Sequence, residues 1–126
     1  MNGADLDVDL VRELYRDSGL GERRPIGDRD RFAEMLRNAN LVLVCRVDGE
    51  LAGIARAVSD FSYVTYLSDI AVARAHQRAG IGRALIDALR EEAPAAKLVL
   101  LAAPAAVDYY PHIGFTRHGS AWVLNP

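Results

Sequence analysis

Apolar side chains early in the sequence recur at helical spacing. They are Leu6, Leu10, Val11, Leu14 and Tyr15. Residues three to four positions apart share one face of a helix, so this pattern predicts an amphipathic helix over residues 6–18. The pattern ends at Ser18-Gly19, and a glycine just after the last periodic residue is typical of a helix C-terminus.

A second, shorter helix is predicted after the loop that contains Pro25-Ile26-Gly27. Asp28 is expected to cap this helix, because a carboxylate at that position can accept hydrogen bonds from free backbone N–H groups. The apolar positions of the helix are Phe32, Met35 and Leu36, and it is expected to end near Asn38.

The spacing then changes to strand-like runs. Residues 41–47 and 51–58 are predicted to form a hairpin, because Asp48-Gly49 between them is the strongest short hairpin signal. Alternation places Cys45 on the same face as Leu41, Leu43 and Val47. Cys45 is therefore expected to be a buried small hydrophobe rather than a nucleophile.

A strand over residues 63–72 is predicted next, followed by a glycine-containing loop and a helix that Pro94 closes. The predicted apolar stripe of this helix is Ile81, Ala84, Leu85, Ala88 and Leu89.

The C-terminal part is predicted to continue with short elements. Residues 97–102 read as a strand covered on both faces, residues 105–112 as a short helix, and residues 115–117 and 121–124 as two final strands. This order of elements predicts a mixed α/β domain with a central sheet.

Composition agrees with a single globular domain over residues 1–126. The chain is 51% hydrophobic and 25% charged, and its formal net charge is -2. Without a clustered basic excess, nucleic acid is not expected as a partner. Of the lysine and arginine residues, all except Lys97 are arginine. The planar guanidinium of arginine can donate two hydrogen bonds to one phosphate, which a lysine ammonium does less well.

Individual residues and short segments of the sequence argue against a disulfide-bonded, metal-binding, secreted or membrane-spanning protein. One cysteine, Cys45, permits no internal disulfide, and His76, His112 and His118 lack metal-ligand spacing, so no metal is expected. Residues 1–5 are acidic and do not resemble a signal peptide. The longest apolar run is interrupted by Pro104 and is too short for a membrane helix, so a soluble, cytoplasmic protein is expected.

The loop before the third helix predicts an anion site. Gly80 and Gly82 let backbone N–H groups face a ligand at a helix N-terminus, and Arg83 would oppose the helix dipole unless an anion were bound. A dinucleotide-binding fingerprint needs glycine or alanine where this chain has Leu85. A P-loop needs lysine followed by serine or threonine where this chain has Arg83-Ala84. Both nucleotide-binding loops are therefore rejected. An ordinary strand-to-helix turn with two glycines is the alternative.

Two blocks of sequence resemble one family. Residues 67–72, followed by Gln77-x-x-Gly80-x-Gly82, are similar to the acetyl-CoA signature of the GNAT N-acetyltransferase superfamily. The second block, Tyr109-Tyr110-Pro111-His112-Ile113-Gly114-Phe115, resembles the family's segment with an aromatic residue, tyrosine and a later Gly-Phe pair. The resemblance covers residues 41–124. The N-terminus departs from it, because Leu6-Asp7-Val8 is barely long enough for the family's first strand.

The resemblance implies a central, mostly antiparallel twisted sheet flanked by helices, with acetyl-CoA as co-substrate. It assigns cofactor binding to the end of the third strand and to the glycine loop. These residues are Ile70, Ala71, Val72, Gln77, Arg78, Ala79, Gly80, Ile81, Gly82 and Arg83.

The resemblance also suggests two catalytic residues, each with an alternative role. Tyr110 would protonate the departing thiolate as general acid, or would pack beneath the cofactor. Asp69 would accept the proton of the amine, directly or through water, or would instead pair with an arginine.

The acceptor side is less defined in the sequence. Phe61, Tyr63, Tyr66 and Ser68 are candidate substrate-binding residues, whereas Trp122 is expected in the core. The predicted function is acetyl transfer from acetyl-CoA to a primary amine of a small molecule in a ternary complex. Alternatives are a non-catalytic acyl-CoA-binding module and protein lysine or N-terminal acetylation. A homodimer is consistent with the resemblance.

Overall fold

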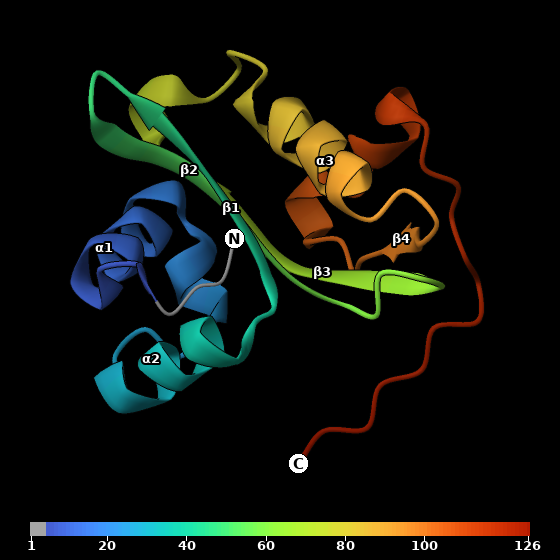
Figure 1. The fold of residues 1–126 in the computed structure, drawn as a ribbon, viewed down its shortest axis with the longest axis horizontal. Coiled ribbons are helices and arrows are strands. Elements are labelled where there is room, and N and C mark those ends of the chain that lie inside the picture. Colours follow the sequence, from blue (N-terminus) through green and yellow to red (C-terminus); the bar gives the residue numbers. More distant parts are fainter. Residues whose placement is uncertain (1–4) are drawn as a thin grey trace.

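The computed structural model describes residues 5–126, which form one mixed sheet with helices on both sides (Figure 1). The elements are α1 (Val8–Ser18), η2 (Leu20–Arg23), α2 (Arg29–Asn38), β1 (Leu41–Val47), β2 (Glu50–Ser59), β3 (Val64–Val72), η3 (Arg74–His76), α3 (Ile81–Glu92), β4 (Lys97–Val99), η4 (Pro104–Ala106) and η5 (Tyr110–Ile113), where η denotes a 3-10 helix. The expectation about a signal peptide falls mainly on residues 1–4, outside the described residues.

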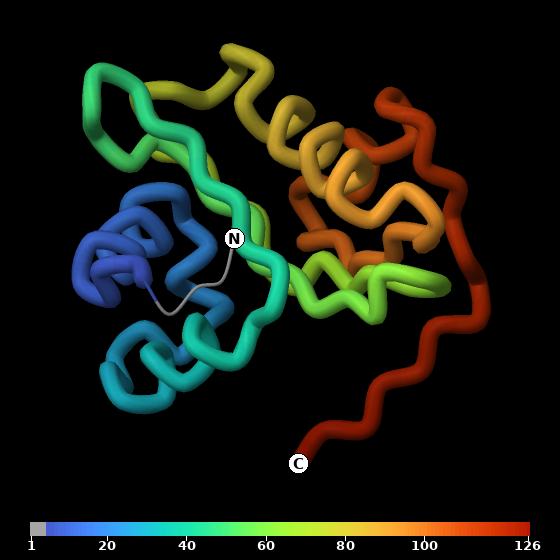
Figure 2. Tube along the Cα trace, viewed as in Figure 1, coloured from blue at the N-terminus to red at the C-terminus, as the bar shows by residue number. Residues whose placement is uncertain are grey.

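The sheet has the strand order β1-β2-β3-β4. The first three strands are antiparallel neighbours, and β4 pairs with β3 in parallel. Helices α1 and α2 pack on one face, called the first face here, and α3 packs on the second face (Figures 1 and 2). The predicted fold class, a mostly antiparallel sheet flanked by helices, is confirmed.

Local signals explain where the N-terminal helices begin and end. The Asp7 side chain accepts hydrogen bonds from the backbone N–H groups of Asp9 and Leu10, so α1 begins at Val8 rather than at residue 6. Gly19 ends α1 with a φ of 93°, a conformation that favours glycine. Asp28 caps α2 through the N–H of Arg31, as predicted. The described part of the chain has no strand before α1.

The turn between β1 and β2 is the predicted hairpin turn. Asp48 and Gly49 both have positive φ angles, 53° and 82°. Two consecutive positive φ values are what a type I′ hairpin turn requires. Cys45 is only partly buried, and it packs against the core of the second face.

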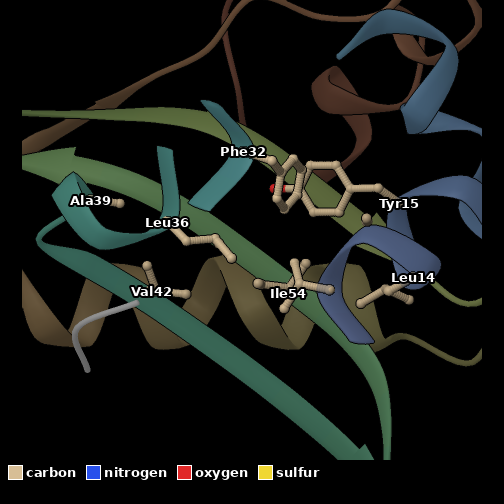
Figure 3. Close-up of a cluster of buried hydrophobic side chains, with 9 residues drawn as sticks. Leu14, Tyr15, Phe32, Leu36, Ala39, Val42 and Ile54 are labelled. Atoms are coloured by element: carbon tan, nitrogen blue, oxygen red, sulfur yellow. The ribbon is translucent and has the colours of Figure 1, made fainter. Parts of the chain in front are cut away.

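Each face of the sheet has its own hydrophobic core. On the first face, Tyr15 of α1 meets Phe32 of α2 edge to ring, with 4.9 Å between ring centroids (Figure 3). On the second face, α3 buries Leu85, Ile86 and Leu89. The predicted stripe of α3 was therefore wrong at Ala84, which is exposed, and omitted Ile86.

Helix α3 lies close to β2 because position 53 is glycine. A Cβ atom at Gly53 would lie 2.9 Å from the Ile81 side chain and 3.3 Å from that of Leu85. The backbone of β2 thus accepts the first turn of α3 at a distance that a side chain would prevent.

The C-terminal predictions were wrong in several respects. Strand β4 ends at Val99 rather than at residue 102, and Val99 and Leu101 are exposed. Two 3-10 helices replace the helix predicted over residues 105–112, and no strand forms over residues 115–117 or 121–124. Neither run pairs with the outer edge of β4, which is the last strand of the sheet among the described residues. Trp122, expected in the core, is 93% exposed on the extended C-terminal segment (Figure 2).

Candidate functional site

Strand β3 contains a bulge at Ser68. Asp69 pairs with Arg56 of β2, whereas the next ladder pair joins Leu67 to Ala57, so Ser68 is the extra residue on β3. A bulge redirects the side chains and backbone groups around it and is frequent beside active sites. The bulge lies in the middle of the segment that the sequence assigned to the cofactor and the substrate.

Strands β3 and β4 separate just before the bulge. Their ladder consists of three pairs and ends at Tyr66 with Val99. From Leu67 to Val72, β3 therefore has no strand partner on its β4 side among residues 5–126. Backbone N–H groups on the β4 side of this open edge are available to a ligand, whereas the Ser68 and Val72 carbonyls accept bonds from the side chains of Arg24 and Gln77. The predicted cofactor residues Ile70, Ala71 and Val72 belong to this stretch.

The open edge leads directly to the N-terminus of α3. The Gln77 side chain donates a hydrogen bond to the Val72 carbonyl, with Nε2 and O 3.0 Å apart, and so ties the loop to the end of β3. Arg78 and Gly80 have positive φ angles of 65° and 85°. No side chain caps α3, whose first turn therefore leaves backbone N–H groups without protein partners.

This helix N-terminus has the features of an anion site. Arg78, Ala79 and Arg83 are exposed beside it. Within residues 5–126 neither arginine forms an ion pair. Free N–H groups, the positive end of the helix dipole and two unpaired guanidinium groups together favour a negatively charged group such as a pyrophosphate.

On the first face, Asp69 is the centre of a buried polar cluster. Its Oδ2 accepts hydrogen bonds from Tyr15 Oη at 2.7 Å and Arg56 Nε at 2.5 Å, and its Oδ1 accepts one from Arg24 Nε at 2.6 Å. Ser68 Oγ contacts Arg56 Nη2 at 2.9 Å. These five residues are called the Asp69 cluster below. The Asp69 side chain itself is fully buried.

The cluster determines the protonation state of Asp69. Burial alone would raise its pKa, but the hydrogen bond and charge of Arg56 outweigh burial, and Tyr15 and Arg24 add to the effect, so the pKa of Asp69 is lowered. A buried carboxylate that already accepts four side-chain hydrogen bonds, the fourth from Ser68 Oγ, and has a lowered pKa is a weak base. The geometry therefore favours the alternative left open by the sequence, in which Asp69 pairs with arginine.

Tyr110 lies on the second face, half-buried against the core that surrounds α3. Its ring meets those of Tyr109 and Phe115 at angles of 71° and 70°, with 5.4 Å between centroids in each pair. Burial, followed by the neighbouring Tyr109, raises the pKa of Tyr110, so its hydroxyl is protonated at neutral pH. A protonated hydroxyl at this position can donate a hydrogen bond to a ligand.

The predicted acceptor residues do not gather in one place. Tyr66 and Ser68 lie on the first face next to the separation of β3 and β4. Phe61 and Tyr63 belong to the turn before β3 and are exposed. The Tyr63 ring instead contacts the Lys97 ammonium, which lies 4.4 Å from the ring centroid.

A groove on the first face was not predicted from the sequence. It has a volume of about 440 Å³ and lies between α2 and β2. Its lining residues are Arg31, Glu34, Met35, Asn38, Ala39, Arg56 and Val58. Arg56 was the available signal, because an arginine within the apolar run of β2 must be buried with a partner. In the described part of the chain, no cluster of His, Cys, Asp and Glu is arranged to hold a metal ion.

Comparisons with known proteins agree with this geometry. In solved structures, the chain is similar to a GNAT family acetyltransferase from Streptococcus pneumoniae TIGR4, with 19% identity over 96% of this chain and 93% of that chain and a TM-score of 0.75. It is similar to the ribosomal-protein-alanine N-acetyltransferase from Brucella melitensis biovar Abortus 2308, with 26% identity over 99% and 96% and a TM-score of 0.73. An aminoglycoside N-acetyltransferase in complex with CoA shares 17% identity over 100% and 91%, with a TM-score of 0.72.

The comparison with protein families covers almost the entire chain. A family model described as "Acetyltransferase (GNAT) domain" matches residues 11–125. This range contains the bulged strand, the glycine loop, the Asp69 cluster and Tyr110. The chain therefore belongs to the GNAT acetyltransferase family and is an acyltransferase.

Proposed function

We propose that this enzyme transfers the acetyl group of acetyl-CoA to a primary amine of a small molecule, by direct attack within a ternary complex. The observation that carries this proposal is the continuity between the open edge of β3 after Tyr66 and the uncapped N-terminus of α3. An extended ligand with a pyrophosphate at one end can bind along the open edge of β3 and place the pyrophosphate at the N-terminus of α3. The Gln77–Val72 hydrogen bond keeps the two parts adjacent.

The residues of this chain fit the co-substrate. Backbone N–H groups at Gly80, Ile81 and Gly82, with Arg78 and Arg83, would hold the pyrophosphate, because charge and free donors coincide there. Backbone groups of Ile70 and Val72 would bind the pantetheine arm and polarise the thioester carbonyl. Gly82 leaves space at the loop, since the nearest atom that a Cβ there would meet is Ile70 Cδ1 at 3.9 Å.

The acceptor amine would approach from the first face. The groove between α2 and β2 lies on that face, and Val58, one of its lining residues, pairs with Tyr66, where β3 and β4 begin to separate. Adjacent strands are about 5 Å apart, so an acceptor in the groove lies within reach of that opening.

The reaction needs two proton movements, one onto the sulfur of the bond that breaks and one away from the nitrogen of the bond that forms. The amine nitrogen forms a bond to the carbonyl carbon, the carbon–sulfur bond breaks, and Tyr110 donates its proton to the sulfur. The attacking nitrogen loses a proton to Asp69 or to ordered water. Because Asp69 is held by Tyr15, Arg24 and Arg56, we favour water as the immediate acceptor.

Acetylation of a protein N-terminus is the second candidate. It is favoured by the similarity to a ribosomal-protein-alanine N-acetyltransferase at 26% identity. In that case, a peptide with an N-terminal alanine would be acetylated in preference to free amines.

A two-step experiment tests the proposal. Acetyl-CoA should raise the melting temperature, since a ligand at 100 times its Kd stabilises the folded state by about 2.7 kcal/mol. Release of free CoA is then measured across a panel of small amines and peptides with N-terminal alanine. No thermal shift at millimolar acetyl-CoA contradicts the co-substrate, and CoA release with peptides alone favours the second candidate.

A further inference from the structure

We propose that Arg24 is a positioning residue for acetyl transfer. Its guanidinium holds the bulge of β3 in the conformation that directs backbone N–H groups toward the thioester carbonyl. This inference rests on the proposed function, because it concerns the same open edge of β3. It assigns a role to an arginine from the segment between α1 and α2, far in sequence from both motifs of the family.

Arg24 binds two successive residues at the bulge. Its Nη2 donates to the Ser68 carbonyl oxygen at 2.8 Å, and its Nε donates to Asp69 Oδ1 at 2.6 Å. A third donor, Nη1, bonds the Arg23 carbonyl at 2.8 Å and fixes the guanidinium to its own loop. The Arg24 side chain is 24% exposed, so the bonds at the bulge are largely shielded from water.

Arg56 and Tyr15 hold Asp69 through the other oxygen of its carboxylate, Oδ2. Arg56 reaches Asp69 from β2, and Tyr15 reaches it from α1. Arg56 Nη2 also donates to Ser68 Oγ. Ser68 is therefore held at its carbonyl and at its side chain, although it has no ladder partner on β2.

Peptide planarity carries this constraint to the open edge. The Ser68 carbonyl and the Asp69 N–H belong to one planar unit, so fixing the carbonyl also fixes that N–H, which points back toward β2, where Asp69 pairs with Arg56. Asp69 is then fixed through its backbone and its carboxylate, and the next peptide, which carries the Ile70 N–H, begins from a fixed residue. Misplacing a catalytic group by about 1 Å can cost about a hundredfold in rate.

The contacts require arginine rather than lysine. Nε and Nη2 of a guanidinium form a rigid fork, and here the two prongs bind two different acceptors. A lysine ammonium would keep the charge beside Asp69 but would not hold both acceptors in one geometry.

The test compares the wild type with Arg24→Gln and uses Arg23→Gln as the matched control, since Arg23 is an exposed arginine in the same segment. Infrared difference spectra are recorded with acetyl-CoA labelled with carbon-13 at the thioester carbonyl. Affinities for acetyl-CoA and for CoA are measured by calorimetry. CoA lacks the carbonyl, so the ratio of the two affinities isolates its recognition.

In the wild type and in Arg23→Gln, we expect the carbonyl band to move to lower wavenumber on binding. In Arg24→Gln, most of that shift should be lost. Acetyl-CoA affinity should fall about tenfold, which corresponds to one lost hydrogen bond, while CoA affinity stays within about twofold. Arg24→Lys should recover stability but not the band shift.

Three results would overturn the inference. The first is a carbonyl band shift and an affinity ratio in Arg24→Gln that equal those of the wild type. The second is an equal loss of affinity for acetyl-CoA and for CoA in Arg24→Gln. The third is a full band shift in Arg24→Lys. If Arg24→Gln does not fold, Arg24→Lys decides the matter by its band alone. A wild type that binds acetyl-CoA without a band shift contradicts the positioning role only, whereas a wild type that does not bind acetyl-CoA contradicts the proposed function.

Discussion

Tyr15 and Asp69 are 54 positions apart in the chain and meet in a buried hydrogen bond of 2.7 Å. This bond fastens α1 to β3 at the bulge. Burial, followed by the adjacent charge of Asp69, raises the pKa of Tyr15, so the phenol remains a donor throughout the accessible pH range. Its ring packs edge to ring on Phe32, which makes Tyr15 both a core residue and a polar partner (Figure 3).

Removing this hydroxyl should destabilise the protein without changing its shape. Tyr15→Phe keeps the ring but takes one donor from a buried carboxylate, and hydrogen bonds to charged groups contribute about 1.5–3 kcal/mol. Urea unfolding should show a loss of that size. The control, Tyr109→Phe, changes an exposed tyrosine and should remain within about 0.5 kcal/mol of the wild type. Equal stabilities of the two variants would contradict the importance of the bond.

Asp69 should make folding stability sensitive to acid. Its pKa is lowered in the folded protein, so its stabilising effect is present above the unfolded value of about 3.9 and is lost as the pH falls through the folded value. The free energy of unfolding, measured between pH 7 and pH 2, should therefore drop in the acid range.

The matching variant is Asp69→Asn. It should lose about 3–5 kcal/mol at neutral pH, because it leaves Arg24 and Arg56 without their counter-charge. Its stability should depend less on pH between 4 and 2 than that of the wild type. Asp87→Asn, at an exposed position of α3, should keep the wild-type dependence. An Asp69→Asn profile parallel to the wild type would show that this carboxylate does not carry the acid sensitivity.

Tyr110→Phe separates binding from chemistry. The ring contacts with Tyr109 and Phe115 persist, so acetyl-CoA affinity should be unchanged. The turnover rate should fall about 10²–10⁴-fold if the hydroxyl protonates the leaving thiolate. Tyr109→Phe serves as the control, with turnover close to the wild type. Undiminished turnover in Tyr110→Phe would leave the packing role as the explanation of this residue.

Gly53→Ala should weaken co-substrate binding from a distance. The added methyl group would meet Ile81 at 2.9 Å, so the first turn of α3 must move or the core must strain, at a cost of about 1–3 kcal/mol. Because the same turn carries the free N–H groups, acetyl-CoA affinity measured by calorimetry should fall as well. Gly27→Ala, where a Cβ atom meets nothing within 4 Å, should change neither quantity.

The parts of the fold that could be predicted from sequence depend on local signals. The caps at Asp28 and Gly19 and the turn at Asp48-Gly49 act within a few residues, and each is present as expected. The α3 stripe was nearly correct for the same reason. The predicted C-terminal strands do not form, because a strand is stable only when it pairs with a neighbour, and no local pattern specifies whether a run will pair with the edge strand β4.

The candidate site also has a part that local sequence predicts and a part that only the fold determines. The glycine loop before α3 is a local motif and lies at the end of β3 as expected. The role of Asp69 could not be read from its neighbours, because its partners come from residues 13 to 54 positions away. An arginine inside β2 and an aspartate inside β3 were signals of a buried charge pair, but Arg56 was not singled out from the sequence, and only the register of the two strands pairs it with Asp69.

The exposed C-terminal segment gives this protein an intrinsic optical probe. Trp122 is the sole tryptophan, and at 93% exposure its indole is in contact with water. When it is excited at a wavelength that the five tyrosines do not absorb, its fluorescence therefore reports on the tail. Any partner, ligand or second copy that covers the tail would shift the emission toward the blue, so association of this segment can be followed on the unlabelled native chain.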